Sequence, residues 1–107
     1  MERSAAIVMV TVSSQAEADK IASVLLENRK AACVNIIPGV ASRFWWQGKI
    51  DSASEEILLI KTRLSLVPQI IELVKKNHSY TVPEIIAVPV IEGSREYLDW
   101  IHAEARE

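Results

Sequence analysis

The order in which two kinds of apolar pattern follow one another constrains this chain more than any other feature of its sequence. Near-continuous apolar runs rich in β-branched residues are typical of strands that are buried on both faces. Apolar residues repeated at three- and four-residue spacing are typical of amphipathic helices. The sequence predicts strand, helix, strand, strand, helix and strand in that order, with a further helix at the end.

The expected strands are the segments 5–12, 32–46, 55–62 and 84–91. Within the second strand, Pro38-Gly39 predicts a bulge or bend, because proline cannot donate a ladder hydrogen bond. At its end, Gln47-Gly48 predicts the turn of a hairpin, and residues 49 and 50 are expected to begin its returning strand. The polar segment 51–54 is compatible with either strand or loop.

Three helices are expected, each beginning near a serine that can accept a backbone N–H. The predicted caps are Ser14, Ser65 and Ser94. Ser14 and Glu17 have the spacing of a capping box, and the first helix is expected to reach Arg29 or Lys30. The predicted inward residues are Ala18, Ile21, Ala22, Leu25 and Leu26 in the first helix, Val67, Ile70, Ile71 and Val74 in the second, and Tyr97, Leu98, Ile101 and Ala105 in the third.

This order matches the split βαβ, ferredoxin-like arrangement, an α+β fold in which an antiparallel sheet carries its two main helices on one face. The second and fourth strands are the edge strands of that topology, and they contain Pro38 and Pro89. Edge strands are where a sheet tolerates proline. With 107 residues, of which 50% are apolar, the chain is predicted to form one domain over 1–107.

The strands also predict a second apolar face that one chain does not cover. The runs 57–60 (Ile-Leu-Leu-Ile) and 85–88 (Ile-Ile-Ala-Val) place apolar side chains on both faces, because successive strand residues point to opposite sides. Trp45 and Trp46 are neighbours, so one indole faces away from the helices. Exposed apolar patches mark interfaces, and self-association is therefore predicted. The alternative is that the closing helix folds back as a lid.

Charge and cysteine content argue against several classes of partner. The 12 basic and 14 acidic residues give a formal net charge of -2, so neither nucleic acid nor an anionic membrane is an expected partner. Cys33 is the single cysteine, which suits a reducing compartment, and the cytoplasm is the expected location. No apolar run approaches the ~20 residues of a membrane span, and no signal peptide is predicted.

Several separated segments, taken in order, resemble the signature of the CutA family. They are 31–40 (AACVNIIPGV), 46–50 (WQGKI), Glu55, 60–62 (IKT), 78–80 (HSY), 82–86 (VPEII), Pro89, Gly93 and 97–101 (YLDWI). The resemblance spans nearly the whole chain. It implies a ferredoxin-like subunit, a compact homotrimer packed sheet against sheet, and a role in tolerance to divalent cations.

Copper binding is described for some members of this family, where the ligands include a cysteine in the first strand and two adjacent histidines. Here the first position corresponds to Val10 and the pair reads Asn77-His78, so the resemblance carries over one ligand, His78. Binding of Cu²⁺ or another divalent cation is therefore expected to be weak, and no cofactor is expected to be required. The usual His-Pro-Tyr reads His78-Ser79-Tyr80, which predicts a less restricted backbone after the second helix.

The polar and aromatic residues that the motif retains are the candidates for a ligand-binding cleft between subunits. They are Trp46, Lys49, Lys61, Tyr80, Glu84 and Trp100, with His78 as the candidate metal ligand. Alternatively, His78 packs as a structural histidine at the end of the second helix. Lys61 is expected to pair with a carboxylate such as Glu84 or Glu55. Cys33 is expected to be buried and chemically quiet.

No enzymatic activity is predicted. Glu55 and Glu56 are adjacent on a strand and point to opposite faces, so they do not form an acid–base couple. The segment 11–14 (TVSS) has neither the glycine nor the arginine of an anion cradle. The expected function is a homotrimeric response to metal ions, with weak cation or small-ligand binding at a cleft between subunits. The alternative is a structural or signalling scaffold, comparable in shape with the PII proteins, that binds a protein partner.

Overall fold

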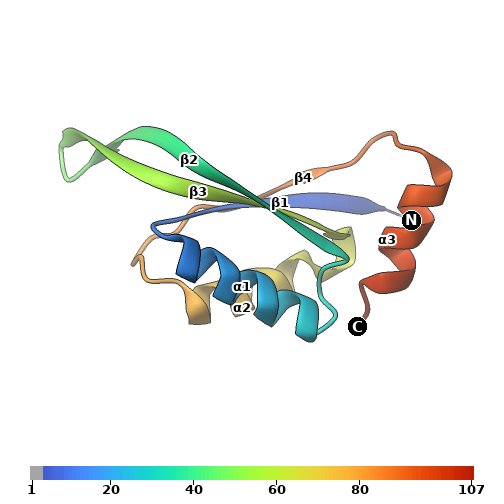
Figure 1. Cartoon of the computed structure of the whole chain (residues 1–107). Helices are drawn as coiled ribbons and strands as arrows, with labels where there is room; N and C mark the ends of the chain where they lie inside the picture. Colours follow the sequence, from blue (N-terminus) through green and yellow to red (C-terminus); the bar gives the residue numbers. More distant parts are fainter. Residues whose placement is uncertain (1–3) are drawn as a thin grey trace.

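The computed structural model describes residues 4–107 and arranges most of them in two layers (Figure 1). The first layer is an antiparallel sheet in the order β2-β3-β1-β4, formed by β1 (Ala5–Val12), β2 (Cys33–Trp46), β3 (Lys49–Arg63) and β4 (Ile85–Pro89). The second layer comprises α1 (Gln15–Glu27) and α2 (Val67–Asn77), which cover one face of the sheet. The helix α3 (Arg95–Glu104) lies beyond the end of the sheet where β1 begins.

The strand order is the ferredoxin-like order predicted from the sequence. β2 and β4 are the edge strands, as the positions of Pro38 and Pro89 indicated. The predicted bulge is present, because the pairing of β2 with β3 shifts its register between Ile37 and Val40. The polar segment 51–54 belongs to β3, so the hairpin is longer than its apolar pattern indicated.

α1 begins after Ser14, whose hydroxyl accepts the backbone N–H of Glu17 at 3.1 Å, as the capping box predicts. The helix ends at Glu27, earlier than predicted, because Arg29 has a left-handed backbone with a φ of 61°. Leu26 was predicted to face inward, but it is 41% exposed.

The predicted cap of α2 is wrong, and the predicted cap of α3 is right in its position but not in its side-chain hydrogen bond. Ser65 lies within the 3₁₀ turn η1 (Leu64–Leu66), and α2 begins at Val67 without a side-chain cap. Pro68 occupies the first turn of α2, where its φ suits the helix and a missing N–H removes no helical hydrogen bond. Ser94 precedes α3 but makes no capping hydrogen bond with its side chain. No helix in the part of the chain described is long and apolar enough to cross a membrane.

The hydrophobic core fills the space between the sheet and its two covering helices. Its fully or almost fully buried members include Val8, Val10, Leu58 and Ile60 from the strands, and Ile21, Leu25, Ile70 and Val74 from the helices. Each such side chain contributes about 1.5–3 kcal/mol through burial. These contacts hold α1 and α2 on one face and so determine where the ends of both helices lie.

The opposite face of the sheet, called the open face here, is also apolar. Strand pairing places Ile7, Met9, Ile57, Leu59, Ile86 and Val88 on it. Ile86 is 51% exposed and Val88 is 41% exposed. Among residues 4–107 no helix covers the centre of this face, because α3 lies at one end of the sheet (Figure 1). α3 is therefore not the lid considered as an alternative, and its Tyr97, predicted to face inward, is 43% exposed.

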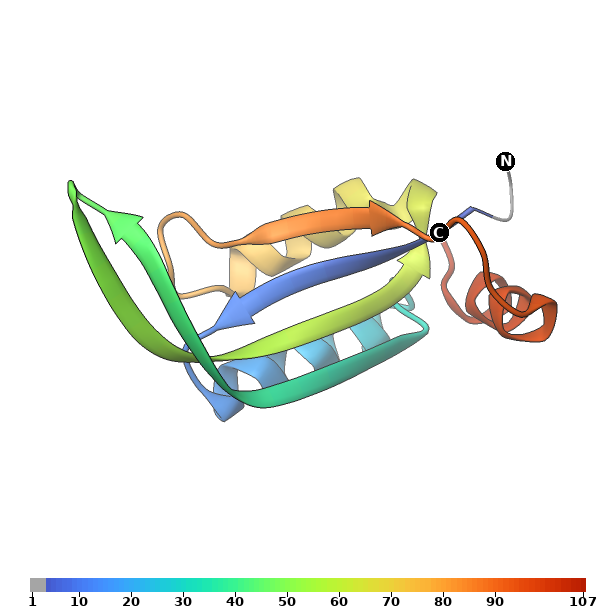
Figure 2. The same ribbon diagram turned by 90° about the horizontal axis from the view of Figure 1, so that it is seen from above.

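β2 and β3 extend beyond β1 as a two-stranded arm, defined as residues 40–55 (Figure 2). Trp46 pairs with Lys49 on the side that continues the open face, and Trp45 pairs with Ile50 on the other side. The two indoles therefore face opposite ways, as predicted. Because the arm extends past the helices, neither indole packs against them, and Trp45 is 72% exposed and Trp46 44% exposed.

Candidate functional site

The residues predicted to line one cleft lie at three separate places in a single chain. Trp46 and Lys49 face each other at the arm tip, Tyr80 and Glu84 follow α2, and Lys61 and Trp100 lie toward the α3 end of the sheet. Lys49 and Lys61 are separated by about 40 Å along β3, at roughly 3.3 Å per residue. One chain does not bring the six residues together, and their convergence stays a prediction that requires a neighbouring copy.

His78 follows α2 directly, and both nitrogens of its ring are engaged. Nε2 donates to the backbone oxygen of Thr11 at 2.7 Å, and Nδ1 accepts the backbone N–H of Tyr80 at 3.1 Å. These partners assign the hydrogen to Nε2 and the lone pair to Nδ1. The side chain has 0% exposure. The geometry is that of a structural histidine, and a metal ion would have to displace the Tyr80 N–H from Nδ1.

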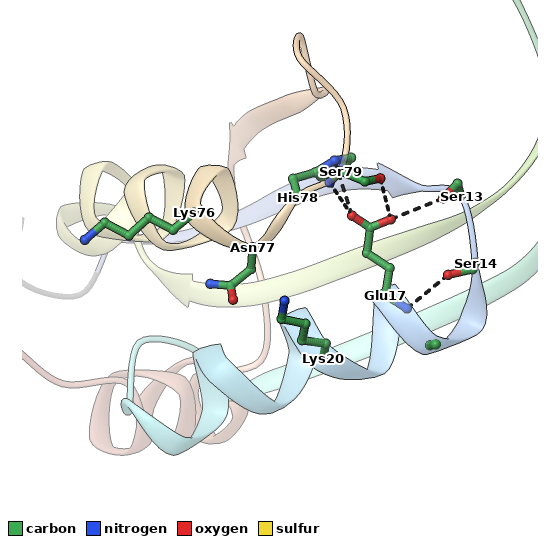
Figure 3. Close-up of a pocket in the computed structure, with 9 residues that line it drawn as sticks. Ser13, Ser14, Glu17, Lys20, Lys76, Asn77, His78 and Ser79 are labelled. Atoms are coloured by element: carbon green, nitrogen blue, oxygen red, sulfur yellow. Dashed lines mark hydrogen bonds and ion pairs between the residues drawn. The ribbon is translucent and has the colours of Figure 1, made fainter.

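The Glu17 carboxylate connects the first turn of α1 to Ser79 (Figure 3). One of its oxygens accepts the backbone N–H of Ser79 at 2.6 Å, and the other accepts the hydroxyls of Ser79 at 3.0 Å and Ser13 at 3.2 Å. The second half of the capping box, in which this carboxylate returns to the Ser14 N–H, is therefore wrong. Burial raises the pKa of Glu17, but the hydrogen bonds from Ser79 and Ser13 and the electrostatic effect of His78 outweigh it, so the pKa lies below its usual value.

Tyr80 connects the same segment to the sheet. Its hydroxyl donates to the Glu55 carboxylate at 2.7 Å, and Glu55 is 7% exposed. Burial, this hydrogen bond and the negative charge of Glu55 raise the pKa of Tyr80 to about 12. The ring centroid of Tyr80 lies 4.8 Å from that of His78. Glu56, the next residue on the strand, points to the opposite face of β3, as predicted.

Lys61 has a different partner from those predicted. Its ammonium donates to the side-chain oxygen of Asn35 on the neighbouring strand. The predicted ion pair with Glu55 is wrong, because the two residues are about 20 Å apart along β3. Glu84 precedes Ile85, which pairs near the far end of β1, so it lies toward that distant end as well.

Cys33 lies directly opposite Lys61 on the open face. It is half-buried, whereas the sequence predicted burial. Its thiol lies 3.8 Å from the Asn35 side-chain oxygen. Burial, together with the electrostatic effect of the nearby Cys33, raises the pKa of Tyr97. A cation thus lies beside the thiol in space although none is adjacent in sequence, and slow reaction of Cys33 with thiol reagents stays a prediction.

An open hollow of about 480 Å³ lies between the beginning of α1 and the end of α2 (Figure 3). Its lining includes Ser13, Glu17, Lys20, Lys76, Asn77 and Ser79. The carboxylate and the two ammonium groups give it mixed charge, which selects no single class of ligand. Among residues 4–107, no three His, Cys, Asp or Glu side chains come close enough together to hold a metal ion.

The sequence did not predict the two hydrogen bonds between Ser79 and Glu17. The capping-box spacing placed Glu17 at a helix start, but its partner lies 62 positions away. Ser79 stands where the family motif has proline, which has neither an N–H nor a hydroxyl to donate. The substitution that predicted a less restricted backbone thus supplies two hydrogen bonds to Glu17. The polar side chain of Ser79, at a position where the motif has proline, was the signal in the sequence that could have indicated these hydrogen bonds.

Comparison with known sequences gives consistent matches. The family described as CutA1 divalent ion tolerance protein matches residues 6–104. The divalent-cation tolerance protein CutA of Thermus thermophilus is 50% identical over 95 residues, which cover 89% of this chain and 92% of that protein. Protein CutA 1, chloroplastic, of Oryza sativa is 45% identical over 101 residues, which cover 94% of this chain. The match covers 57% of the Oryza protein, so the chain spans little more than half of that relative's length.

Solved structures agree with these matches. The Thermus thermophilus divalent cation tolerance protein superposes with a TM-score of 0.93 at 47% identity, over 95% of this chain and 99% of that one. CutA1 from Oryza sativa gives a TM-score of 0.94 at 43% identity, over 97% of this chain and 95% of that one. With a family match across nearly all of its length and relatives this similar in sequence and fold, the chain belongs to the CutA1 divalent ion tolerance family.

Proposed function

We propose that this protein serves tolerance to divalent cations as a non-catalytic homotrimer that weakly binds a cation such as Cu²⁺, or a small ligand, in clefts between its subunits. Family membership supports the link to divalent cations. The proposed location is the cytoplasm, supported by the single cysteine. The proposal includes no required cofactor, nucleic acid or membrane.

The observation that carries the proposal is that one chain leaves two apolar surfaces in water, the open face and the arm. Several of their side chains are more than two-fifths exposed, among them Ile37, Trp45, Trp46, Ile50, Ile86 and Val88. Leaving a few hundred Å² of apolar surface in water costs several kcal/mol at roughly 25 cal/mol per Å². A two-stranded ribbon such as the arm is marginally stable at best by itself. Both surfaces therefore favour packing against another copy.

A cyclic arrangement satisfies both surfaces. Each copy has one arm and one open face, so an arm that packs on the open face of the next copy makes head-to-tail contacts, which form a ring when the rotation between copies closes. The number three is the one that the family resemblance implies. Such packing would bring Trp46 and Lys49 at the arm tip to another copy's sheet, which supports a cleft shared between subunits.

Light scattering after size exclusion tests the assembly on the full chain. We expect three chains per particle at micromolar concentration. Leu59→Asp places an unpaired charge in the centre of the open face and should dissociate the particle, since such a charge costs several kcal/mol when buried. Ser23→Asp, at an exposed position of α1, is the matched control and should leave it intact. A monomeric wild-type protein, or a Leu59→Asp variant that stays trimeric, would contradict the proposal.

A scaffold that binds a protein partner is the second candidate function, favoured by one observation. Trp45 and Ile50 form a cross-strand pair on the arm side turned away from the open face, at 72% and 68% exposure. Large exposed apolar pairs mark protein interfaces. Acrylamide quenching of a variant that retains Trp45 as its single tryptophan separates the roles. Full quenching in the assembled protein favours a partner surface, and protection assigns Trp45 to the trimer itself.

A further inference from the structure

Residues 79–84, called the strap here, connect α2 to β4 and are held by hydrogen bonds that all involve side chains. All of these residues are described, and none forms a hydrogen bond between two backbone groups. The hydrogen bonds of the strap are all made by Ser79 and Tyr80. Farther along, Val82 is 71% exposed and Glu84 is exposed. A segment with so few buried contacts opens at a low free energy.

Two carboxylates from different elements hold the strap in place. Glu17 of α1 accepts both donors of Ser79, toward which its side chain points in Figure 3. Glu55 of β3 accepts the Tyr80 hydroxyl at 2.7 Å. Hydrogen bonds to carboxylates are roughly twice as strong as those between neutral groups. Removing the Glu17 contacts would leave Tyr80 as the remaining attachment of the strap.

The closed strap also determines what the ring of His78 can bind. The Tyr80 backbone N–H occupies Nδ1, the atom that carries the lone pair, and a Glu17 oxygen lies 3.5 Å from the same atom, while the Thr11 carbonyl occupies Nε2. The His78 side chain has 0% exposure, and the Tyr80 ring lies 4.8 Å from it. Neither nitrogen is available to a ligand while Tyr80 stays in place. Because Tyr80 follows Ser79 directly, release of Ser79 leaves Tyr80 held only by its bonds to Glu55 and His78, which lowers the free energy needed to move it away from the ring.

We propose that the strap is a gate over His78, which Glu17 holds closed through Ser79 and whose opening makes Nδ1 available to a ligand. The identity of that ligand as a divalent cation rests on the proposed function. The gate itself rests on the hydrogen bonds of residues 79–84 and on the burial of the imidazole.

Opening can be measured without any metal on the assembled protein. Glu17→Gln keeps the shape of the side chain but removes its negative charge, so the hydrogen bonds to the Ser79 N–H and hydroxyl lose their charge-assisted strength. We expect hydrogen exchange of the Ser79 and Tyr80 amides, the two in the strap that are hydrogen-bonded, to accelerate about tenfold. Diethyl pyrocarbonate, which acylates an accessible imidazole nitrogen, should label His78 faster by a similar factor, with His102 as the internal reference.

Asp19→Asn is the matched control, since it removes the same charge from an exposed position of the same helix. It should change neither rate. Ser79→Ala leaves Glu17 intact and removes one hydroxyl bond, so a smaller acceleration is expected even where Glu17→Gln folds poorly. Unchanged exchange and unchanged labelling of His78 in both the Glu17→Gln and Ser79→Ala variants would overturn the gate.

Calorimetry with Cu²⁺ alone then tests whether the ligand that reaches His78 is a divalent cation. If opening limits access, Ser79→Ala, which keeps the Glu17 carboxylate 3.5 Å from His78 Nδ1, should bind Cu²⁺ more tightly by about the factor measured for its opening, and a further His78→Ala should remove the gain. Faster labelling with no gain in Cu²⁺ affinity would support the gate and contradict a cation response at His78. Cu²⁺ binding that is indifferent to His78→Ala would likewise count against the proposed function, while the exchange and labelling rates would still decide whether the strap is a gate.

Discussion

Glu17 accepts both the backbone N–H and the hydroxyl of Ser79, a residue 62 positions further along the chain, at 2.6 Å and 3.0 Å. This contact joins the first turn of α1 to the residues that leave α2. Two donors of one residue meet the two oxygens of one carboxylate, an arrangement that is stronger than neutral hydrogen bonds. Its contribution to stability depends on the charge of Glu17.

Stability should fall when Glu17 is protonated. Its pKa is lower in the folded protein than the usual 4.5, so its contribution is present above about pH 4.5 and is lost as the pH falls through the folded pKa. Glu17→Gln should lower the free energy of unfolding by about 1–3 kcal/mol at neutral pH and by less near about pH 3. Thermal unfolding of both proteins measures this, with Asp19→Asn as control. A deficit that is the same at both pH values would contradict the assignment.

Tyr80 should ionise only in strongly alkaline solution. Its pKa is raised from 10.0 to about 12, so its contribution to stability is complete below about pH 10 and is lost as the pH rises through about 12. Phenolate absorbance measures the titration. Tyr80→Phe should remove one of the two tyrosine steps and leave that of Tyr97, whose pKa is also raised. A Tyr80 that titrates at its ordinary pKa would mean that the hydrogen bond to Glu55 is not kept in solution.

The arm tip should respond to substitutions that suit or oppose a left-handed backbone. Gln47 and Gly48 have φ values of 51° and 78°, the pattern of a type I′ turn. Gly48→Ala should destabilise the protein by about 1–2 kcal/mol, although nothing lies within 4 Å of an added Cβ. Gln47→Asn should stabilise it by about 0.5 kcal/mol, because asparagine tolerates this backbone. Denaturant unfolding measures both, and a Gly48→Ala variant as stable as the wild type would exclude this turn type.

Copper binding should be weak and should depend on His78. Val10 and Asn77 replace two of the ligands that the family resemblance implies, and both nitrogens of His78 are engaged in the closed state. A single imidazole with nearby oxygen donors holds Cu²⁺ weakly, so we expect a dissociation constant in the micromolar range or higher. Calorimetry on the wild type and His78→Ala, with any affinity tag removed, measures it. Nanomolar binding that survives His78→Ala would show that the site lies elsewhere.

Local patterns in the sequence determined the element order, the edge strands, the bulge at Pro38-Gly39 and the second apolar face. Each depends on periodicity or on the backbone restrictions of proline and glycine, which act within a few residues. The same reasoning misplaced the cap at Ser65. Pro68 offered a competing start signal close by, and the residues between them formed a separate 3₁₀ turn.

Tertiary structure alone decided the pairs that give the candidate site its chemistry. The Lys61 ammonium binds Asn35 because the pairing of β2 with β3 places Asn35 within reach. Glu55 lies farther along β3, the strand that contains Lys61. Likewise, the partner of Glu17 and the occupation of both His78 nitrogens depend on how the end of α2 packs against α1 and β1. Such contacts join residues far apart in the chain, and one inserted residue at a bulge reverses which face the following side chains occupy. Periodicity predicts the elements, but only their packing and register select the partners.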